Sequence, residues 1–151
     1  MRRVCTQSIS FRAATTADIE WLVELRIETM GEHLRASGED VVPDVQRARV
    51  IQDFECIRIV TEGVQSIGMV KVVKESSRWR LFQIQLIPER QGEGIGGGIV
   101  GELLDEARRQ KISVVLSVLK VNPARRLYER LGFKIVAEKG RAYEMRADPH
   151  Q

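Results

Sequence analysis

Hydrophobic and acidic residues both recur with helical spacing in the segment that follows Thr15. Apolar positions three and four apart form one stripe and glutamates four apart form another, so we expect a helix with a core face and an acidic face. Thr15 and Asp18 stand three residues apart before it, which is the spacing of a capping box. The apolar stripe is Ile19, Leu22, Val23, Ile27, Met30 and Leu34, and the acidic stripe is Glu20, Glu24, Glu28 and Glu32.

The rest of the chain alternates between strand-like and helix-like segments that are separated by turn signals. β-Branched and aromatic runs predict strands, whereas Asn122 and Pro123 stand where a helix begins and Gly132 where it ends. We expect strands at 8–15, on both sides of a turn at Glu62 and Gly63, in "WRLFQIQLI", in "ISVVLSVL", and near 133–137 and 141–146. We expect further helices from Asp44 to Phe54, from the glycine-rich stretch to about Arg109, and from Asn122 to Gly132.

This order of elements predicts a fold of the α/β class, in which helices cover both faces of a mixed sheet. The length of 151 residues fits one ordinary domain, whose core we place at about residues 8–147. No internal repeat or linker divides the chain. We therefore expect a single domain over residues 1–151.

The composition is that of a globular protein in solution, with 43% hydrophobic and 30% charged residues. No apolar run approaches the roughly 20 residues of a membrane span, and the first residues are too polar for a signal peptide, so we expect a cytoplasmic protein without membrane contact. The net charge is +3, but the basic residues form no block, which argues against a nucleic-acid partner.

Cys5 and Cys56 lie far apart in the sequence, and neither belongs to a CxxC pair nor has a neighbouring histidine. This spacing indicates neither a zinc site nor a redox pair. We therefore expect two thiols without a chemical role and no metal cofactor.

The stretch "PERQGEGIGGGIVGELL" holds five glycines between Gly92 and Gly98, at the start of an expected helix. Each glycine costs a helix roughly 1 kcal/mol relative to alanine, and a plain tight turn would need only one or two of them. Glycine lets another group approach the backbone, and free N–H groups at a helix start bind anions. The stretch therefore favours a pyrophosphate ligand.

Two other phosphate-binding motifs fit this stretch poorly. A P-loop requires GxxxxGK, and the chain has no such lysine. The dinucleotide pattern GxGxxG matches formally from Gly92 or from Gly96, but the next strand ends in Lys120 where an acidic residue is needed. Too little chain follows for the second half of a doubly wound domain, so an NAD-dependent oxidoreductase is only a minor alternative.

The segment "LIPERQGEGIGGGIV" resembles the acetyl-CoA motif Q/R-x-x-G-x-G/A of the GNAT superfamily of N-acetyltransferases, matched by Gln91, Gly94 and Gly96. A second segment, "NPARRLYERLGF", resembles the superfamily pattern A-x-x-x-Y-x-x-x-G-F, which is matched by Ala124, Tyr128, Gly132 and Phe133. The resemblance implies a mostly antiparallel sheet that splays around an acyl-CoA site. It also implies direct transfer of acetyl from acetyl-CoA to a primary amine in a ternary complex.

For the acetyl-CoA donor, the resemblance implies contacts made mainly by the backbone. The strand around Gln85 would bind the pantetheine arm like an added strand, and the glycine loop would hold the pyrophosphate. Glu93 stands in that loop where a basic or neutral residue is more usual, and Asn122 either contacts the cofactor or serves only as a helix cap. The expected cofactor-binding residues are Ile84, Gln85, Leu86, Gln91, Gly92, Glu93, Gly94, Ile95, Gly96, Gly97 and Asn122.

Tyr128 is the expected catalytic residue. In the superfamily a tyrosine at this position often returns a proton to the leaving CoA thiolate, and a phenol with a pKa of about 10 is protonated at pH 7. The backbone N–H of Leu86 would stabilise the oxyanion of the tetrahedral intermediate. The alternative is a core role, because Ala124, Leu127, Tyr128 and Leu131 form one helical stripe.

The sequence leaves the general base open. Relatives commonly place a carboxylate on the strand before the glycine loop, where this chain has Gln83 and Gln85. These glutamines could order a water chain, the amine could arrive already neutral, or a group on the first helix could accept the proton. The candidates on that helix are Glu28, Glu32 and His33.

The expected acceptor is the amine of a small molecule or peptide, bound between residues 21–50 and the turn at 138–141, with the protein acting as a monomer or homodimer. Arg26 lies beside the apolar stripe, where its guanidinium could hold a substrate carboxylate, whereas the glutamate stripe would favour a cationic amine. Further candidate substrate contacts are Glu28, His33 and Gln83. The alternative function is a non-catalytic module that binds or senses acyl-CoA.

Overall fold

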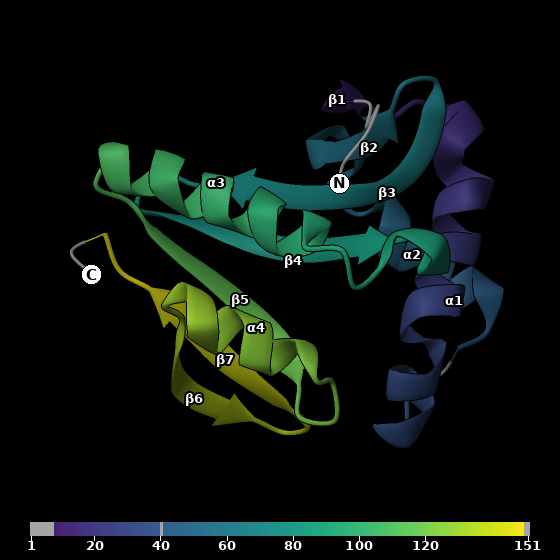
Figure 1. Cartoon of the computed structure of the whole chain (residues 1–151). Coiled ribbons are helices and arrows are strands. Elements are labelled where there is room, and N and C mark those ends of the chain that lie inside the picture. The colour runs from purple at the N-terminus through teal and green to yellow at the C-terminus, as the bar shows by residue number, and fades with distance from the viewer. Residues whose placement is uncertain (1–7, 40, 150–151) are drawn as a thin grey trace.

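The computed structural model describes residues 8–39 and 41–149, and these residues form a seven-stranded sheet flanked by helices (Figure 1). Every strand and α-helix expected from the sequence is present in the expected order. The strands are β1 (Ile9–Ala13), β2 (Ile57–Glu62), β3 (Gln65–Lys74), β4 (Arg78–Leu86), β5 (Ser113–Leu119), β6 (Lys134–Lys139) and β7 (Ala142–Ala147). The α-helices are α1 (Ile19–Ala36), α2 (Pro43–Ile51), α3 (Ile95–Arg109) and α4 (Ala124–Leu131).

The sheet is mixed and mostly antiparallel, which confirms the predicted fold class. Its strand order is β1-β2-β3-β4-β5-β7-β6, and only the β4–β5 pair is parallel within the described residues. A parallel pair needs a crossover connection, and α3 supplies it between β4 and β5.

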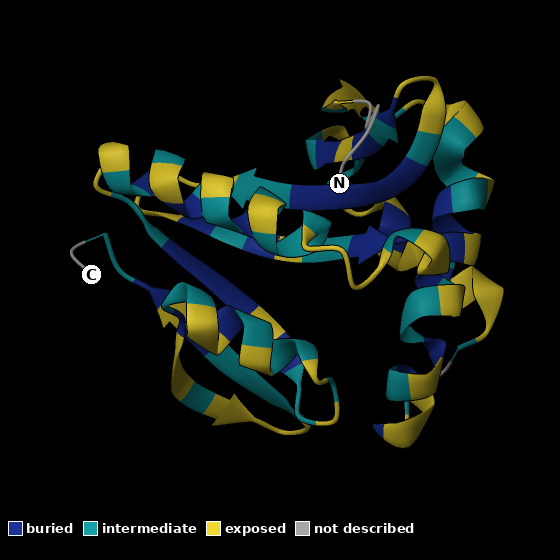
Figure 2. Ribbon diagram, in the orientation of Figure 1, coloured by how far each residue is buried: buried dark blue, intermediate teal, exposed yellow. Residues whose placement is uncertain are grey.

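The helices cover both faces of the sheet, as two neighbouring residues of β3 demonstrate. Met69 packs in one core cluster with residues of α1 and α2, whereas Val70 packs in the other with residues of α3 and α4. Successive side chains of a strand point to opposite faces, so the two helix pairs lie on opposite sides. Figure 2 shows the buried residues concentrated on the central strands between these layers.

The capping box before the first helix is confirmed, although a short 3-10 turn separates it from α1. The Thr15 N–H donates to the Asp18 carboxylate at 2.8 Å, and Arg12 forms two hydrogen bonds of 2.9 Å with the same carboxylate. These bonds, the one from Arg12 foremost, lower the pKa of Asp18 to about 2. Along α1 the glutamate stripe is exposed, and Glu20 at its start is ion-paired with Arg47 of α2.

The substitution Asp18→Asn is expected to destabilise the protein by about 1 kcal/mol at pH 7, the typical contribution of a helix cap. A carboxyl group with a lowered pKa stabilises the fold above its ordinary pKa of about 4 and loses this effect as the pH falls towards 2. The difference between variant and wild type should therefore shrink between about pH 5 and pH 2 in urea denaturation. Asp105→Asn, at an exposed ion pair with Arg108, is the control and should change stability by less than about 0.5 kcal/mol at either pH.

Strands β4 and β5 diverge after a short paired region, and this divergence opens the sheet (Figure 1). Their pairing runs only from Arg78↔Ser113 to Leu81↔Leu116. On the other edge of β4, the register with β3 shifts between the pairs Lys71↔Gln83 and Val72↔Leu81, so Phe82 is an extra, bulged residue. A bulge bends its strand, and here the bend accompanies the separation of β4 from β5.

Helix α2 ends at Ile51, three residues before the expected end at Phe54. Asp53 adopts a left-handed conformation with φ of 53°, which an α-helix cannot continue through. The Lys71 ammonium also donates to carbonyls at the end of α2, including those of Arg49 at 3.1 Å and Val50 at 3.2 Å. A buried lysine from β3 thus caps the helix, an interaction that the local sequence does not reveal.

Two further expectations concern the cysteines and the membrane. Cys56 is a free, half-buried thiol, and Cys5 lies outside the described residues. Among residues 8–39 and 41–149 we find no helix with both the length and the apolar character needed to cross a bilayer.

Candidate functional site

The glycine loop presents a run of backbone N–H groups that nothing in the described structure accepts. Gly92 and Gly94 have φ values of 77° and 84°, in the left-handed region that favours glycine. The Gly98 N–H makes the first helical bond, to the Gly94 carbonyl at 2.9 Å, whereas the N–H groups of residues 92–97 have no backbone or side-chain acceptor among residues 8–39 and 41–149. Such a cluster of free donors at a helix start is suited to an anion.

The end of β4 presents free backbone groups towards the gap between β4 and β5. The Ile87 N–H donates to the Ile67 carbonyl of β3, and hydrogen-bonded positions alternate along an antiparallel pair. Gln85 therefore faces β3, and the backbone groups of Ile84 and Leu86 face the other way, where β5 has already diverged. An extended ligand can bind this edge like an added strand, and the Leu86 N–H is free to act as a donor.

A cavity of about 560 Å³ joins the glycine loop to this strand edge. It is lined by the expected residues Ile84, Gln85, Leu86, Gln91, Gly92, Gly94, Ile95, Gly96, Gly97, Asn122, Tyr128 and His33. The sequence reasoning missed Thr29, Met30 and Arg130, which also line it. Arg130 lies two residues after Tyr128 on α4, and a basic residue so close to the second motif was a signal that could have been used.

Two loop side chains have hydrogen-bond partners within the protein. The Gln91 amide Nε2 donates to the Leu86 carbonyl at 2.9 Å, so this residue ties the loop to the end of β4. Glu93 does not line the cavity; its carboxylate is exposed and accepts a 3.4 Å hydrogen bond from Arg90, which is also ion-paired with Glu62. Because the carboxylate points outward and is partly compensated by Arg90, it repels an anion in the loop less than an inward carboxylate would.

Tyr128 lies where two cavities meet, because its side chain lines both the cavity just described and a second one on the α1 side of the splayed strands. The residue is 9% exposed, and its ring makes an edge contact with Phe133, with ring centroids 5.7 Å apart. Burial raises the pKa of Tyr128. The residue therefore belongs to the core cluster and lines the site at once, so the two interpretations of its helical stripe do not exclude each other.

Asn122 caps α4 and also lines both cavities. Its Oδ1 accepts the Ala124 N–H at 2.9 Å, which satisfies one of the free donors at the helix start. The Nδ2 group makes no hydrogen bond with the described residues and can donate to a ligand. Gly132 ends the helix with φ of 111°, as the sequence indicates.

The second cavity, of about 280 Å³, holds two of the candidate substrate residues, Arg26 and Gln83. It also contains Arg49 and Glu39, which form an ion pair of 3.3 Å and which the sequence reasoning missed. Glu28, in contrast, is exposed and lines neither cavity. The same is true of Glu32, so His33 is the titratable candidate of α1 that reaches the site.

The turn between β6 and β7 approaches the end of α1, on the expected side of the acceptor region. Gly38 follows α1 with φ of 78°, and the Arg141 guanidinium occupies the space where a Cβ at Gly38 would stand, 1.8 Å from that position. The backbone of Arg141 is fixed in turn, because its carbonyl accepts the Lys120 N–H at 2.9 Å. This contact brings the end of α1 against the turn between β6 and β7.

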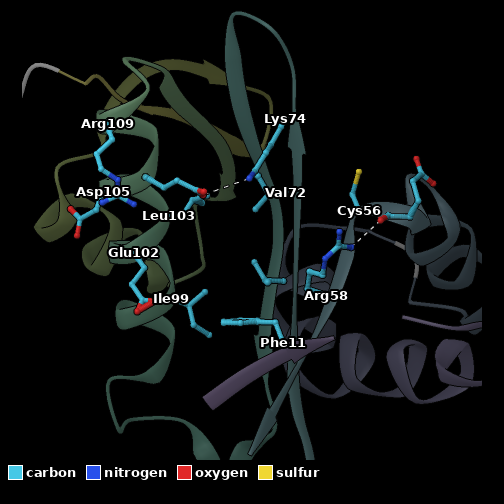
Figure 3. A pocket seen from close by; sticks show the side chains of 13 residues that line it. Phe11, Cys56, Arg58, Val72, Lys74, Ile99, Glu102, Leu103, Asp105 and Arg109 are labelled. Carbon is cyan, nitrogen blue, oxygen red and sulfur yellow. Dashed lines mark hydrogen bonds and ion pairs between the residues drawn. The ribbon is translucent and has the colours of Figure 1, made fainter. Parts of the chain in front are cut away.

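A larger cavity, of about 830 Å³, lies on the other side of α3 and contains none of these residues (Figure 3). Its walls are apolar side chains such as Phe11, Ile99 and Leu103, together with charged groups, some of which already have partners. Lys74 is ion-paired with Glu106 at 3.5 Å, and Arg58 donates to the Glu55 carbonyl at 3.0 Å. Since this cavity has no free backbone donors of the glycine loop, we place the site at the splayed strands.

Comparison with known proteins decides the family. The sequence profile of the acetyltransferase (GNAT) domain matches residues 53–135, which is more than half of the chain. This chain belongs to the GNAT acetyltransferase family. No curated protein matches the sequence of this GNAT protein significantly.

Solved structures similar to this GNAT protein share its fold at low sequence identity. The PaiA N-acetyltransferase from Thermoplasma acidophilum in complex with coenzyme A is 18% identical, with a TM-score of 0.72 over 93% of this chain and 99% of that one. The ribosomal-protein-S18-alanine N-acetyltransferase from Escherichia coli is 19% identical, with a TM-score of 0.70 over 93% and 94%. A chimera of the spermidine N-acetyltransferase SpeG from Vibrio cholerae and hSSAT is 22% identical, with a TM-score of 0.64 over 94% and 96%.

These likenesses confirm the fold of this GNAT protein and leave its substrates to the chemistry of its own site. Among residues 8–39 and 41–149, no group of three His, Cys, Asp or Glu side chains is placed to hold a metal ion.

Proposed function

We propose that the protein is a single-domain N-acetyltransferase, with a core at about residues 8–147, that transfers acetyl from acetyl-CoA directly to a primary amine of a small molecule or peptide. The observation that carries the proposal is the run of unaccepted N–H groups at residues 92–97, in one cavity with a free strand edge and a buried phenol. A binding site for a diphosphate, an amide-bearing arm and a thioester is needed for this reaction. The three features supply these in that order.

The donor would be held mainly by the backbone. The N–H groups around Gly94 and Gly96 would donate to the pyrophosphate, and the free backbone groups of Ile84 would pair with an amide of the pantetheine arm. Arg130 and the Nδ2 of Asn122 line the same cavity and would add donors. Because most of these contacts use the backbone, the loop tolerates a residue such as Glu93 whose side chain points away.

The chemistry would occur where the two cavities meet. The acceptor nitrogen attacks the thioester carbonyl carbon, and the negative charge that develops on the carbonyl oxygen is stabilised by the Leu86 N–H. As the C–S bond breaks, the thiolate takes the proton of the Tyr128 hydroxyl. Burial keeps Tyr128 protonated until that moment, because it disfavours the phenolate.

His33 would remove the proton from the attacking amine, as the titratable candidate of α1 that lines the cavity with the glycine loop. His33→Gln is expected to lower kcat/KM about 100-fold at pH 7, within the usual range for a general base. The loss should diminish as the pH approaches the pKa of the amine itself, about 10 for an alkyl amine, because the acceptor then arrives neutral. Glu28→Gln, at an exposed position outside both cavities, is the control, and a loss that is equal at all pH values would contradict the base role.

The direct test of the proposed function is a thermal-shift comparison of coenzyme A, acetyl-CoA, longer acyl-CoAs and NAD, followed by a panel of amines with detection of free thiol. Stabilisation by coenzyme A and acetyl-CoA, with thiol release on addition of an amine, is expected. Binding of acetyl-CoA without transfer to any amine would favour the acyl-CoA sensor, and stabilisation by NAD alone would favour an oxidoreductase.

A further inference from the structure

The second cavity, which we call the acceptor cavity, continues into a small recess of about 160 Å³ that is rich in cationic groups. Arg26, Arg49, Phe82 and Gln83 line both the cavity and the recess, so the two are connected. The bulge at Phe82 contributes to this wall, since it places an extra residue of β4 beside Gln83. At about 30 Å³ for a water molecule in the liquid, the recess can hold a carboxylate with a few attached atoms and not a folded peptide segment.

Arg26 is a buried cation without a carboxylate partner among the described residues. The residue is 8% exposed, and its Nε donates to the Gln46 Oε1 at 2.6 Å. No described Asp or Glu oxygen lies within 4.0 Å of its guanidinium. Burial, and then the positive charge of Arg49, lower the pKa of Arg26 to about 10, while Glu39 acts in the opposite direction. A buried charge is favourable only when it is paired, so this guanidinium calls for an anion.

The neighbouring charges do not neutralise Arg26. Arg49 is already paired with Glu39 at 3.3 Å, and Lys71 uses its three donors on the carbonyls at the end of α2. Lys71 itself lies close enough for the charge of Arg26 to lower the pKa of its ammonium, after the larger effect of burial. With Asp53, the recess and the adjoining cavity hold three cations and two carboxylates, which leaves one positive charge in excess.

Gln83 adds an unsatisfied acceptor to the same wall. Its Oε1 atom is buried and has no hydrogen-bond partner in the described structure. A buried amide oxygen without a donor is costly, and an N–H group of a ligand would satisfy it. The recess therefore combines a cation that requires a carboxylate with an acceptor that requires an N–H.

We propose that the acceptor is an amine that also carries a carboxylate, in chemical class an amino acid, with its carboxylate on Arg26 and its nitrogen next to Gln83. This inference rests on the proposed acetyl transfer and names its substrate class. Arginine is suited to the role because its planar fork binds a carboxylate with two parallel hydrogen bonds. The same excess positive charge disfavours a polyamine, which would bring further ammonium groups into the recess.

The test compares matched acceptors that differ only in the carboxylate. Wild-type protein with acetyl-CoA is assayed for thiol release with proteinogenic L-amino acids, with their α-amides, and with the corresponding decarboxylated amines. We expect kcat/KM to be roughly 10- to 100-fold higher for the acid than for its amide in the best series, the effect of one hydrogen-bonded charge pair. Arg26→Gln should raise KM for the acid by a similar factor, so that the preference for the acid over its amide is lost.

Two further variants protect the test against misfolding. Arg49→Gln removes the second cation of the cavity, at a half-exposed position where a substitution disturbs folding less. It should also raise KM for the acid, and it serves as the test if Arg26→Gln does not fold. Arg47→Gln is the matched control, because Arg47 lies on the same helix but pairs with Glu20 and Asp44 outside the recess. The control should leave the preference for the acid unchanged.

A binding measurement separates this inference from the proposed function. The melting temperature of each variant is measured with acetyl-CoA present, with and without the amino acids. If amino acids stabilise wild type but not Arg26→Gln while no thiol is released, the carboxylate site stands and the transfer reaction is wrong. If acetyl transfer occurs but amides and decarboxylated amines serve as well as the acids, or if no amino acid is either acetylated or stabilising, the inference is overturned.

Discussion

Tyr128→Phe is expected to lower kcat by about 10²- to 10⁴-fold, the usual range for the loss of a general acid, with no change in the affinity for acetyl-CoA. The substitution removes the hydroxyl and keeps the ring, so the edge contact with Phe133 and the core packing should persist. A coenzyme A thiolate that finds no proton donor is a poor leaving group. The measurement is steady-state kinetics together with calorimetric titration of acetyl-CoA.

The pH dependence of this loss distinguishes an acid from a spectator. Burial raises the pKa of Tyr128 above its ordinary value of 10.0, so the phenol stays protonated through pH 9 and the loss should be constant between pH 6 and pH 9. Tyr143→Phe is the matched control: Tyr143 is partly buried against the same core, with Lys120 and Arg125 over its ring, and lines neither cavity of the site. Unchanged kcat in Tyr128→Phe would assign Tyr128 to packing alone.

The local patterns of the sequence were sufficient for the order of elements and for the loop. Helix caps such as Thr15 with Asp18, and the end of α4 at Gly132, depend on residues a few positions apart, so the sequence states them directly. The glycine loop is also predictable from neighbouring residues, because left-handed backbone positions such as Gly94 are occupied by glycine. These are the parts of the fold that the structure confirms.

The register of the sheet and the contents of the recess could not be predicted in this way. The bulge at Phe82 exists only relative to β3, and the burial of Arg26 depends on α2 and β4 packing around it. Lys71 looks like an ordinary polar position of a strand, yet it caps a helix that ends some twenty residues earlier. Such features arise from contacts between distant segments, for which one sequence holds no periodic signal.

Side-chain direction was the other limit. Glu28 and Glu32 belong to the predicted acidic stripe of α1 and face solvent. His33, the residue after Glu32, lines the cavity instead. Glu93 was expected in the loop that binds the cofactor, and its carboxylate turns to Arg90 instead. A spacing of 3.6 residues per turn resolves which face a residue is on, but which face the cavity occupies depends on the neighbouring strands.

Gly96→Val is expected to weaken coenzyme A binding by about 100-fold or more without loss of stability. Gly96 lies in the first turn of α3 and lines the cavity, and a Cβ there would meet only the Leu86 side chain at an ordinary 3.8 Å. The protein itself therefore tolerates the side chain, and replacing a glycine in a helix is neutral to slightly stabilising. Cβ atoms of a helix point towards its N-terminus, so the valine would occupy the space in front of the free N–H groups.

Gly98→Val is the matched control, since Gly98 lies one residue beyond Gly97 on the same helix, is exposed, and would have no heavy atom within 4 Å of an added Cβ. It lines neither cavity of the site, and its N–H is already used by the Gly94 carbonyl. Gly97 is unsuitable, because a Cβ there would press on Leu127 at 3.3 Å and disturb the contact between α3 and α4. Calorimetry and thermal denaturation on both variants measure affinity and stability separately. Equal coenzyme A affinity in the two variants would mean that the free N–H groups at the start of α3 do not bind the diphosphate, because only one substitution fills the space before them.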